Sequence, residues 1–255
     1  MSDTKLNKIP DKLSNFYFIM HCIINILKYH YFNITVFKNV QFFKLFRNLV
    51  KILPEIPEEW INYIFRRRRE MIIKMSKGEA KREEILLEFT RALPAIVTDG
   101  PAGLNASIKM VGVLPKEKYI PELLNMINDL ISKKPKMEEI VKFLLEKIYV
   151  EDVLDFTKLF TLDLAKKNTW RNINETRKAV LIFFTPPTKS YMIKADVTIH
   201  VDDKIFQFAN AMHDLYHVVP KTGKIVSKSP TYVFHIREIW DKSADKFGVK
   251  IFPPE

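Results

Sequence analysis

The sequence contains a single cysteine, Cys22, among its 255 residues. It therefore cannot form an intramolecular disulfide or a metal site that needs several thiolates, and a reducing cytoplasm is the expected location. Glycine is also scarce, with six in the chain. Because P-loops and dinucleotide-binding turns need glycine where backbone amides approach a phosphate, the sequence argues against both.

No apolar run is long enough to cross a bilayer. The most apolar stretch, Phe16–Leu27, is interrupted by His21 and Asn25 and is followed by Lys28, whereas a spanning helix needs about 20 apolar residues. We expect neither a transmembrane helix nor a cleavable signal. Acidic residues are outnumbered, 30 against 41 basic ones, which gives a net charge of +11. The hydrophobic content of 47% is that of a globular protein with a real core.

Motifs of the common hydrolases are missing as well. The chain has no G-x-S-x-G elbow and no H-E-x-x-H pair, so no motif supports a hydrolase, and the catalytic residues stay unknown. His213 and His217 are four residues apart, which places both rings on one helix face, as in a two-histidine metal site. A pair is half of such a site, and the alternative is two surface or helix-end histidines. We predict no metal.

Residues 1–92 are predicted to form an N-terminal helical region. From Val36 to Leu53 apolar residues recur with a helical period and are interspersed with lysine and arginine, which is typical of a basic amphipathic helix. Such a helix docks on the main domain or on a second subunit, or lies on a membrane surface. A second helix is predicted from Glu58 to Arg91, with a break near Gly78.

Four consecutive arginines, Arg66–Arg69, lie in that second helix. Successive residues are turned by about 100° around a helix, so the four cannot all lie on one face. Residues 66–82 contain eight basic and two acidic residues. This charge fits a solvated helix surface, or contact with an anionic partner such as nucleic acid or phosphate.

Strand patterns begin at Leu93. We predict strands at Leu93–Thr98, Leu104–Leu114, Leu159–Leu162, Ala179–Phe184, Tyr191–Val201 and Thr231–Trp240. Helices are predicted at Pro121–Ser132, Lys136–Lys147, Asn168–Thr176 and Asp202–His217, and the first two form a helical insertion at about residues 116–155. The predicted fold class is α+β, with an antiparallel sheet that forms a small barrel.

The order of these elements resembles the pyridoxamine 5'-phosphate oxidase-like family, the FMN-binding split barrels. The segments that carry the resemblance are Ala95–Ser107, Leu159–Thr161, Lys166–Ile173, Ala179–Phe184 and Tyr191–Ile199, and the similarity covers about residues 93–240. It implies a six-stranded antiparallel split β-barrel over residues 93–255. It also implies a homodimer that binds FMN in clefts between the subunits.

In that family, basic and hydroxyl side chains from the second hairpin strand and from the start of a short helix hold the FMN phosphate. The resemblance implies that role here for Ser107, Lys109, Thr161, Lys166, Lys167 and Thr169. Cationic and hydroxyl donors suit a phosphate dianion. The alternative for the last three is a solvated helix start with Thr169 as the N-cap.

Two further side chains near this helix start have predicted roles. The resemblance would bring Trp170 close to the flavin, and the alternative for Trp170 is core packing. Asn172 is expected to cap or position the helix rather than to contact the cofactor.

The predicted function is that of an FMN-binding split-barrel protein, with activity as a flavin-dependent oxidoreductase. In such an enzyme the cofactor supplies the redox chemistry and the protein supplies binding and orientation. The alternative is a non-enzymatic binding or regulatory protein on the same barrel. Its basic N-terminal helices would contact nucleic acid or an acidic partner.

Overall fold

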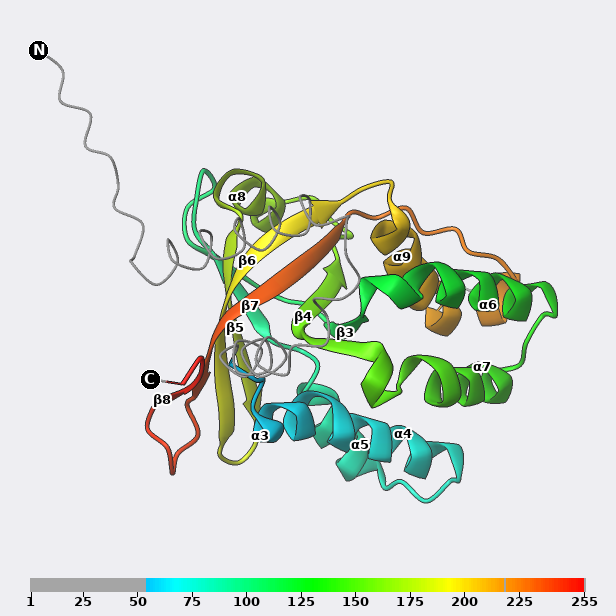
Figure 1. Cartoon of the computed structure of the whole chain (residues 1–255), viewed down its shortest axis with the longest axis horizontal. Helices are drawn as coiled ribbons and strands as arrows, with labels where there is room; N and C mark the ends of the chain where they lie inside the picture. Colours follow the sequence, from blue (N-terminus) through cyan, green and yellow to red (C-terminus); the bar gives the residue numbers. More distant parts are fainter. Residues whose placement is uncertain (1–53, 218, 255) are drawn as a thin grey trace, which may run out of the picture. The chain divides into compact units, whose positions relative to one another are not determined.

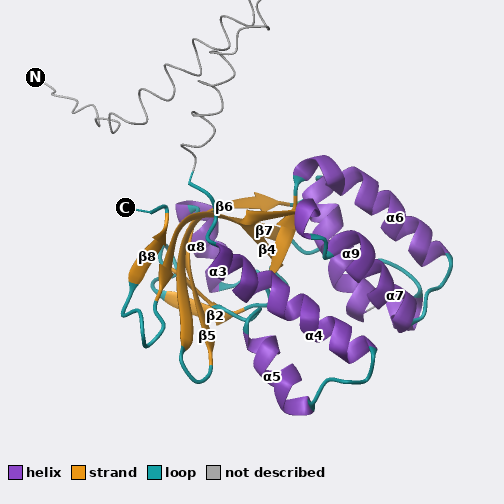
Figure 2. Ribbon diagram, turned by 60° about the horizontal axis from the view of Figure 1, so that its bottom comes forward, coloured by secondary structure: helices purple, strands orange, loops and turns teal. Residues whose placement is uncertain are grey.

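The computed structural model describes residues 54–217 and 219–254. The apolar stretch Phe16–Leu27, Cys22 and the basic helix predicted at Val36–Leu53 lie outside this part of the chain. Within it, no helix is long and apolar enough to cross a membrane. The described chain combines one antiparallel sheet with helices, several of which gather on one side of the sheet (Figures 1 and 2).

The sheet has eight strands in the order β2-β1-β5-β6-β7-β4-β3, with β8 paired to β7. All pairings are antiparallel. The strands are β1 (Ala95–Thr98), β2 (Asn105–Ile108), β3 (Gly112–Pro115), β4 (Leu154–Leu162), β5 (Lys178–Thr185), β6 (Lys189–His200), β7 (Thr231–Asp241) and β8 (Val249–Phe252).

Eight strands replace the six that the sequence predicts. The returning strand expected at Leu104–Leu114 is two strands, because β2 pairs with β1 whereas β3 pairs with β4. Residues 109–111 join these two ends of the strand order. A continuous strand pattern does not show that its two halves take different partners. The short strand β8 was missed.

The helical segments before the sheet are α3 (Glu58–Ile61), the π-helical turn η2 (Asn62–Arg66), α4 (Arg67–Ser76) and α5 (Arg82–Thr90). The predicted break is confirmed, since α4 ends before Gly78, which has a φ of +71°. The insertion contains η3 (Glu117–Tyr119), α6 (Ile120–Ser132), α7 (Met137–Phe143), the π-helical turn η4 (Leu144–Ile148) and η5 (Glu151–Val153). The remaining helices are α8 (Asn168–Thr176), α9 (Lys204–His217) and α10 (Val219–Thr222).

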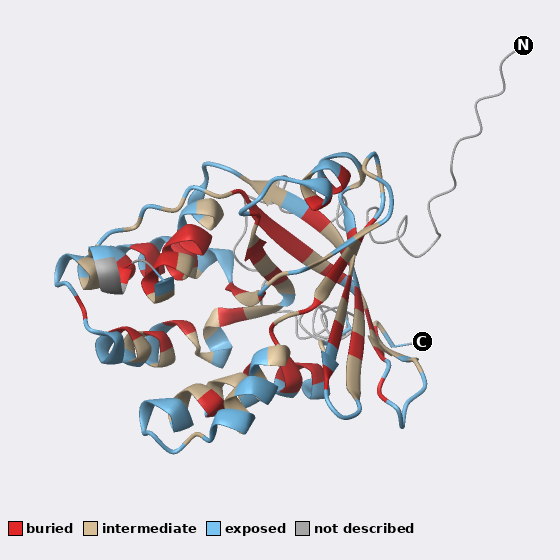
Figure 3. Cartoon of the chain, turned by 180° about the vertical axis from the view of Figure 1, so that it is seen from behind, coloured by how far each residue is buried: buried red, intermediate tan, exposed pale blue. Residues whose placement is uncertain are grey.

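Two apolar cores hold these elements together (Figure 3). The first lies among the inward-facing residues of the strands and includes Trp60 of α3, whose ring centroid is 5.3 Å from that of Phe183 and 5.5 Å from that of Tyr191. The second packs α6, α7 and α9 against the other face of β4 and β7, where Val233 is buried. The segment that begins at Glu58 thus shares a core with the sheet. The division predicted at residue 92 remains a prediction.

Candidate functional site

A pocket of about 290 Å³ opens beside the first turn of α8. Three segments line it. β2 supplies Asn105 and Ser107, and Lys109 follows directly after this strand. The loop after β4 supplies Asp163 and Ala165, and the start of α8 supplies Lys167, Asn168 and Thr169. We call it the β2–α8 pocket. Four of the seven predicted site residues, Ser107, Lys109, Lys167 and Thr169, therefore meet in one place.

The strand period explains why β2 presents polar side chains here. Asn105 and Ser107 pair with the buried residues Thr98 and Ile96, so they share one face of the sheet, whereas Ala106 and Ile108 face the other way. Their partner in the pocket is Thr169. Its Oγ1 accepts a hydrogen bond from Asn105 Nδ2 at 2.9 Å and lies 3.1 Å from Ser107 Oγ.

The N-terminus of α8 adds backbone donors to the pocket, because the first N–H groups of a helix have no acceptor within the helix. The N-cap residue is Lys167, and no side chain caps the helix. The expectation that Thr169 is the N-cap is therefore wrong. Thr169 is the second helical residue, and its hydroxyl is directed to β2 instead.

Asp163 anchors the cationic side of the pocket. Its carboxylate is 2% exposed and accepts hydrogen bonds from the Tyr232 hydroxyl and from the backbone N–H groups of Ala165 and Lys166, both at 3.2 Å. Lys109 Nζ lies 3.4 Å from Oδ1. Burial opposes the charged form, but the Tyr232 hydrogen bond, the Lys109 charge and the two amides together lower the pKa of Asp163.

The pocket therefore carries an ionised carboxylate and two lysines, a net positive charge next to a helix N-terminus. Asp163 fixes the ammonium of Lys109, which is 16% exposed, at the pocket wall. Lys167 is exposed and has no ion-pair partner among the described residues. An anion with several oxygen acceptors suits this arrangement of cations, hydroxyls and amides.

The other three predicted residues lie outside this lining. Thr161 is buried on β4 and donates to the Met110 carbonyl at 2.6 Å. Lys166 is exposed, with Nζ 5.6 Å from the centroid of the Trp170 ring. Trp170 stacks on Tyr232 at a centroid distance of 6.3 Å, beside the first core. Their contact with a cofactor stays a prediction.

Sequence reasoning missed Asn105, Asp163, Ala165 and Asn168. Side chains two residues apart on a strand lie on the same face, so the prediction for Ser107 could have been extended to Asn105. Asp163 had no such signal, because its partner Tyr232 is 69 residues further along the chain.

Asn172 positions α8, as expected. Its Nδ2 donates to the Gly103 carbonyl at 2.7 Å, and its Oδ1 accepts from Ala102 N at 2.8 Å. The side chain is fully buried and thereby ties the turn before β2 to the helix.

The paired histidines of α9 belong to a different contact. The ring centroids of His213 and His217 are 4.9 Å apart, and His213 Nδ1 is 2.9 Å from Asp214 Oδ1. The buried Asp214 accepts the backbone N–H groups of Val226 and Ser227 at 2.6 and 2.8 Å, which fastens that loop to α9. No group of three or more metal-ligating side chains occurs within residues 54–217 and 219–254.

No family model matches the sequence, and no curated protein matches it. Several solved structures similar to this fold are described as pyridoxamine 5'-phosphate oxidase-related or FMN-binding proteins, the family that the sequence resembles. HupZ of Group A Streptococcus is 13% identical, over 67% of this chain and 98% of its own, with a TM-score of 0.40.

Two further solved structures show a comparable similarity. A pyridoxamine 5'-phosphate oxidase-related, FMN-binding protein of Nostoc punctiforme is 13% identical over 63% of this chain and 82% of its own, with a TM-score of 0.36. An FMN-binding protein of Syntrophomonas wolfei is 11% identical over 72% and 92%, with a TM-score of 0.34.

Proposed function

We propose that the β2–α8 pocket binds the phosphate of FMN and that the protein is a flavin-binding split-barrel protein. The observation that supports this most strongly is that Ser107 and Thr169, 62 residues apart in sequence, face each other with Lys109 and Lys167 around one pocket of about 290 Å³. The sequence resemblance assigns the FMN phosphate to these four residues.

The donor set suits a phosphate ester. Two ammonium groups, two hydroxyls and the first amides of α8 are the groups that bind phosphate in proteins. Asp163 does not oppose this role, because its charge is satisfied by Lys109, Tyr232 and two backbone amides. When bound, the flavin would supply redox chemistry, and Ser107, Lys109, Lys167 and Thr169 would hold and orient it.

We propose that a second copy of the chain completes the site. The pocket is at the small end of the range for ligand sites, which run from about 300 to 1,000 Å³, so the flavin ring needs further surface. Leu164, an apolar residue next to the pocket, is 66% exposed. A partner subunit on this side would cover it, and size-exclusion chromatography with light scattering should give a homodimer.

An apolar row across the outer face of the sheet, opposite to Ser107, supports a homodimer by a separate argument. Ile108, Ala95, Ile182, Met192 and Trp240 are in register across β2, β1, β5, β6 and β7. None of the five belongs to either core. Such a row is the kind of surface that a subunit interface buries.

The arginine quartet favours the flavin site over a nucleic-acid surface. Arg66 pairs with Glu58 and Glu151, Arg68 donates to the Val111 carbonyl, and Arg69 donates to the Tyr149 carbonyl. Three of the four arginines thus bond within the protein. We therefore place the function at the β2–α8 pocket. From the sequence resemblance we propose an oxidoreductase activity, and from the single cysteine a cytoplasmic location.

A titration of the full-length protein with FMN, followed by flavin fluorescence, tests the site. Lys167→Ala and Lys109→Ala should each weaken FMN binding by about ten- to a hundredfold, because a hydrogen bond to a charged group contributes about 1.5 to 3 kcal/mol. Lys142→Ala is the matched control, because Lys142 is exposed on α7 and outside the pocket. Equal affinities for all four proteins would show that the pocket does not hold the phosphate.

A further inference from the structure

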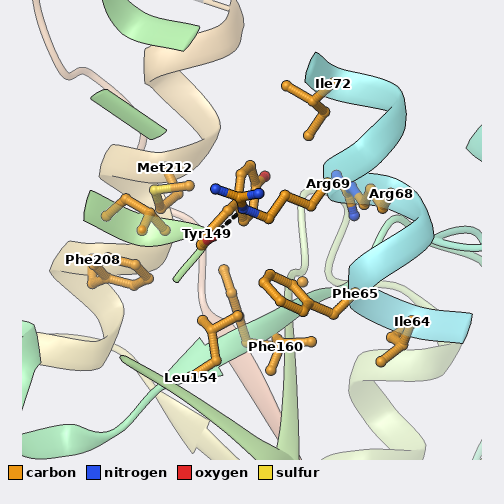
Figure 4. Close-up of a pocket in the computed structure, with 13 residues that line it drawn as sticks. Ile64, Phe65, Arg68, Arg69, Ile72, Tyr149, Leu154, Phe160, Phe208 and Met212 are labelled. Atoms are coloured by element: carbon orange, nitrogen blue, oxygen red, sulfur yellow. Dashed lines mark hydrogen bonds between the residues drawn. The ribbon is translucent and has the colours of Figure 1, made fainter. Parts of the chain in front are cut away.

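A second pocket lies between α4, the end of the helical insertion and α9 (Figure 4). Its walls are mostly apolar and include Phe65, Ile72, Phe208 and Met212. Arg68 and Arg69 are the two cationic side chains that line it. We call it the arginine pocket; its volume is about 40 Å³, so it suits a small ligand.

The two arginines have charges that no described residue neutralises. Arg69 extends across the pocket, and its Nε donates to the Tyr149 carbonyl at 2.9 Å (Figure 4). Its two Nη atoms have no hydrogen-bond partner among the described residues. Arg68 Nη1 donates to the Val111 carbonyl at 3.2 Å. Neither guanidinium forms an ion pair within the described chain, whereas Arg66, on the same helical segment, pairs with two glutamates.

The neighbouring phenol of Tyr216 does not supply the missing negative charge. The hydroxyls of Tyr149 and Tyr216 are 3.0 Å apart. Burial and the nearby Tyr149 raise the pKa of Tyr216, so this phenol stays neutral. The pocket therefore combines two half-buried cations with apolar walls and no anion.

Irregular helical turns build both sides of the pocket. The π-helical turn η2 ends at Arg66, two residues before Arg68, and the π-helical turn η4 ends at Ile148, directly before Tyr149. Such turns occur frequently at functional sites. Here each of them ends within two residues of a side chain that lines the pocket.

We propose that the arginine pocket binds a small carboxylate that carries a short apolar chain. The planar fork of a guanidinium matches the two oxygens of a carboxylate, and the free Nη atoms of Arg69 are in place to donate to them. The apolar walls suit a few methylene groups. A phosphate is disfavoured, because the apolar lining gives its remaining oxygens no donors.

Thermal unfolding of the full-length protein in sodium acetate, propionate, butyrate and hexanoate, at constant ionic strength set with sodium chloride, measures this binding. Affinity should rise about fourfold with each methylene from acetate to butyrate, as for burial of a CH₂ group, and stop rising by hexanoate because the pocket is small. Butyramide, the neutral analogue of butyrate, should give no stabilisation. Equal stabilisation by butyramide, or by inorganic phosphate, would overturn the proposal.

Two pairs of variants locate the effect. Arg69→Gln should abolish the butyrate shift, whereas Arg67→Gln should keep it, because Arg67 is exposed and does not line the pocket. Ile72→Asp places a carboxylate four residues after Arg68 and three after Arg69, within reach of both, and should also abolish the shift. Met137→Asp makes the same change at an exposed position outside the pocket and should keep it.

The second pair keeps the test decisive if Arg69→Gln does not fold. Ile72 is at the side of the pocket and belongs to neither core, so Ile72→Asp leaves both cores intact. An unchanged butyrate shift in Ile72→Asp would contradict the assignment of the ligand to this pocket.

Discussion

The two pockets differ in the partners of their cationic side chains. In the β2–α8 pocket, the ammonium of Lys109 lies next to a buried carboxylate that is itself held by three further donors. In the arginine pocket, the contacts of the two guanidiniums with described residues are two carbonyl oxygens and a weak sulfur contact. The first arrangement fixes a cation in place for a polar anion, and the second leaves cations whose charge a ligand must balance.

One short segment of chain separates the pockets. Ser107 and Lys109 line the β2–α8 pocket, and Gly112 and Val113 line the arginine pocket. Between them, the Val111 carbonyl accepts from Arg68, and Val111 N donates to Ala92 at 2.8 Å. The same crossover that divides the predicted strand in two thus supplies a wall to each pocket.

Asp163→Asn should produce the largest loss of stability, because it removes the charge that Lys109 pairs with and weakens the Tyr232 contact. Breaking a buried ion pair costs about 3 to 5 kcal/mol of unfolding free energy. Urea denaturation followed by circular dichroism measures it. A loss below about 1 kcal/mol would show that Asp163 does not hold this side of the pocket.

The unfolding free energy at acidic pH should also depend on the Asp163 carboxylate. Because the folded-state pKa of Asp163 lies below its ordinary value of 3.8, its contribution is complete above that pH and is lost as the pH falls through the folded pKa. The difference in unfolding free energy between wild type and Asp163→Asn should therefore shrink below pH 4 and stay constant between pH 5 and 7. A constant difference down to pH 2 would contradict the shift.

Gly112→Ala should have a smaller effect, on the wall of the arginine pocket. A Cβ there would lie 2.8 Å from Cε1 of Phe160, so the ring must move, and overpacking costs about 1 to 3 kcal/mol. Gly103→Ala is the comparison. A Cβ at Gly103 meets no atom within 4 Å, so the cost of this substitution comes from the φ of +71°, which alanine adopts less readily than glycine. The first variant should be the less stable of the two in the same denaturation experiment.

Arg69→Met should change the unfolding free energy least, by less than about 1 kcal/mol. It gives up one hydrogen bond to a carbonyl but also removes an unpaired charge from an apolar site. Its contrast with Asp163→Asn sharpens the difference between the pockets. A loss of 3 kcal/mol or more would mean that the guanidinium stabilises the fold and is not available to bind a ligand.

Local patterns in the sequence predict much of the fold. Helix α8 has the predicted bounds, and β5 and β7 differ from theirs by one residue at each end or less, because apolar runs and turn residues mark them. Pairing between distant segments has no such marker. This is why the division into β2 and β3, the strand β8 and the Asp163–Tyr232 contact could not be read from the chain.

The sequence predicted part of the β2–α8 pocket. Ser107, Lys109, Lys167 and Thr169 were identified from resemblance, and the structure brings them together. The arginine quartet shows the converse. Its helical phase predicted that the side chains diverge, but their surroundings depend on the helical insertion and on α9, which no local pattern places beside α4.

A comparison of FMN with riboflavin tests the central claim most directly, because the two differ by the phosphate alone. Fluorescence titration of the full-length protein should give an affinity for FMN at least a hundredfold higher than for riboflavin, and Lys167→Ala should bring the two within about tenfold of each other. Equal affinity for FMN and riboflavin in the wild type, or no binding of either, would contradict the assignment of the β2–α8 pocket to the flavin phosphate.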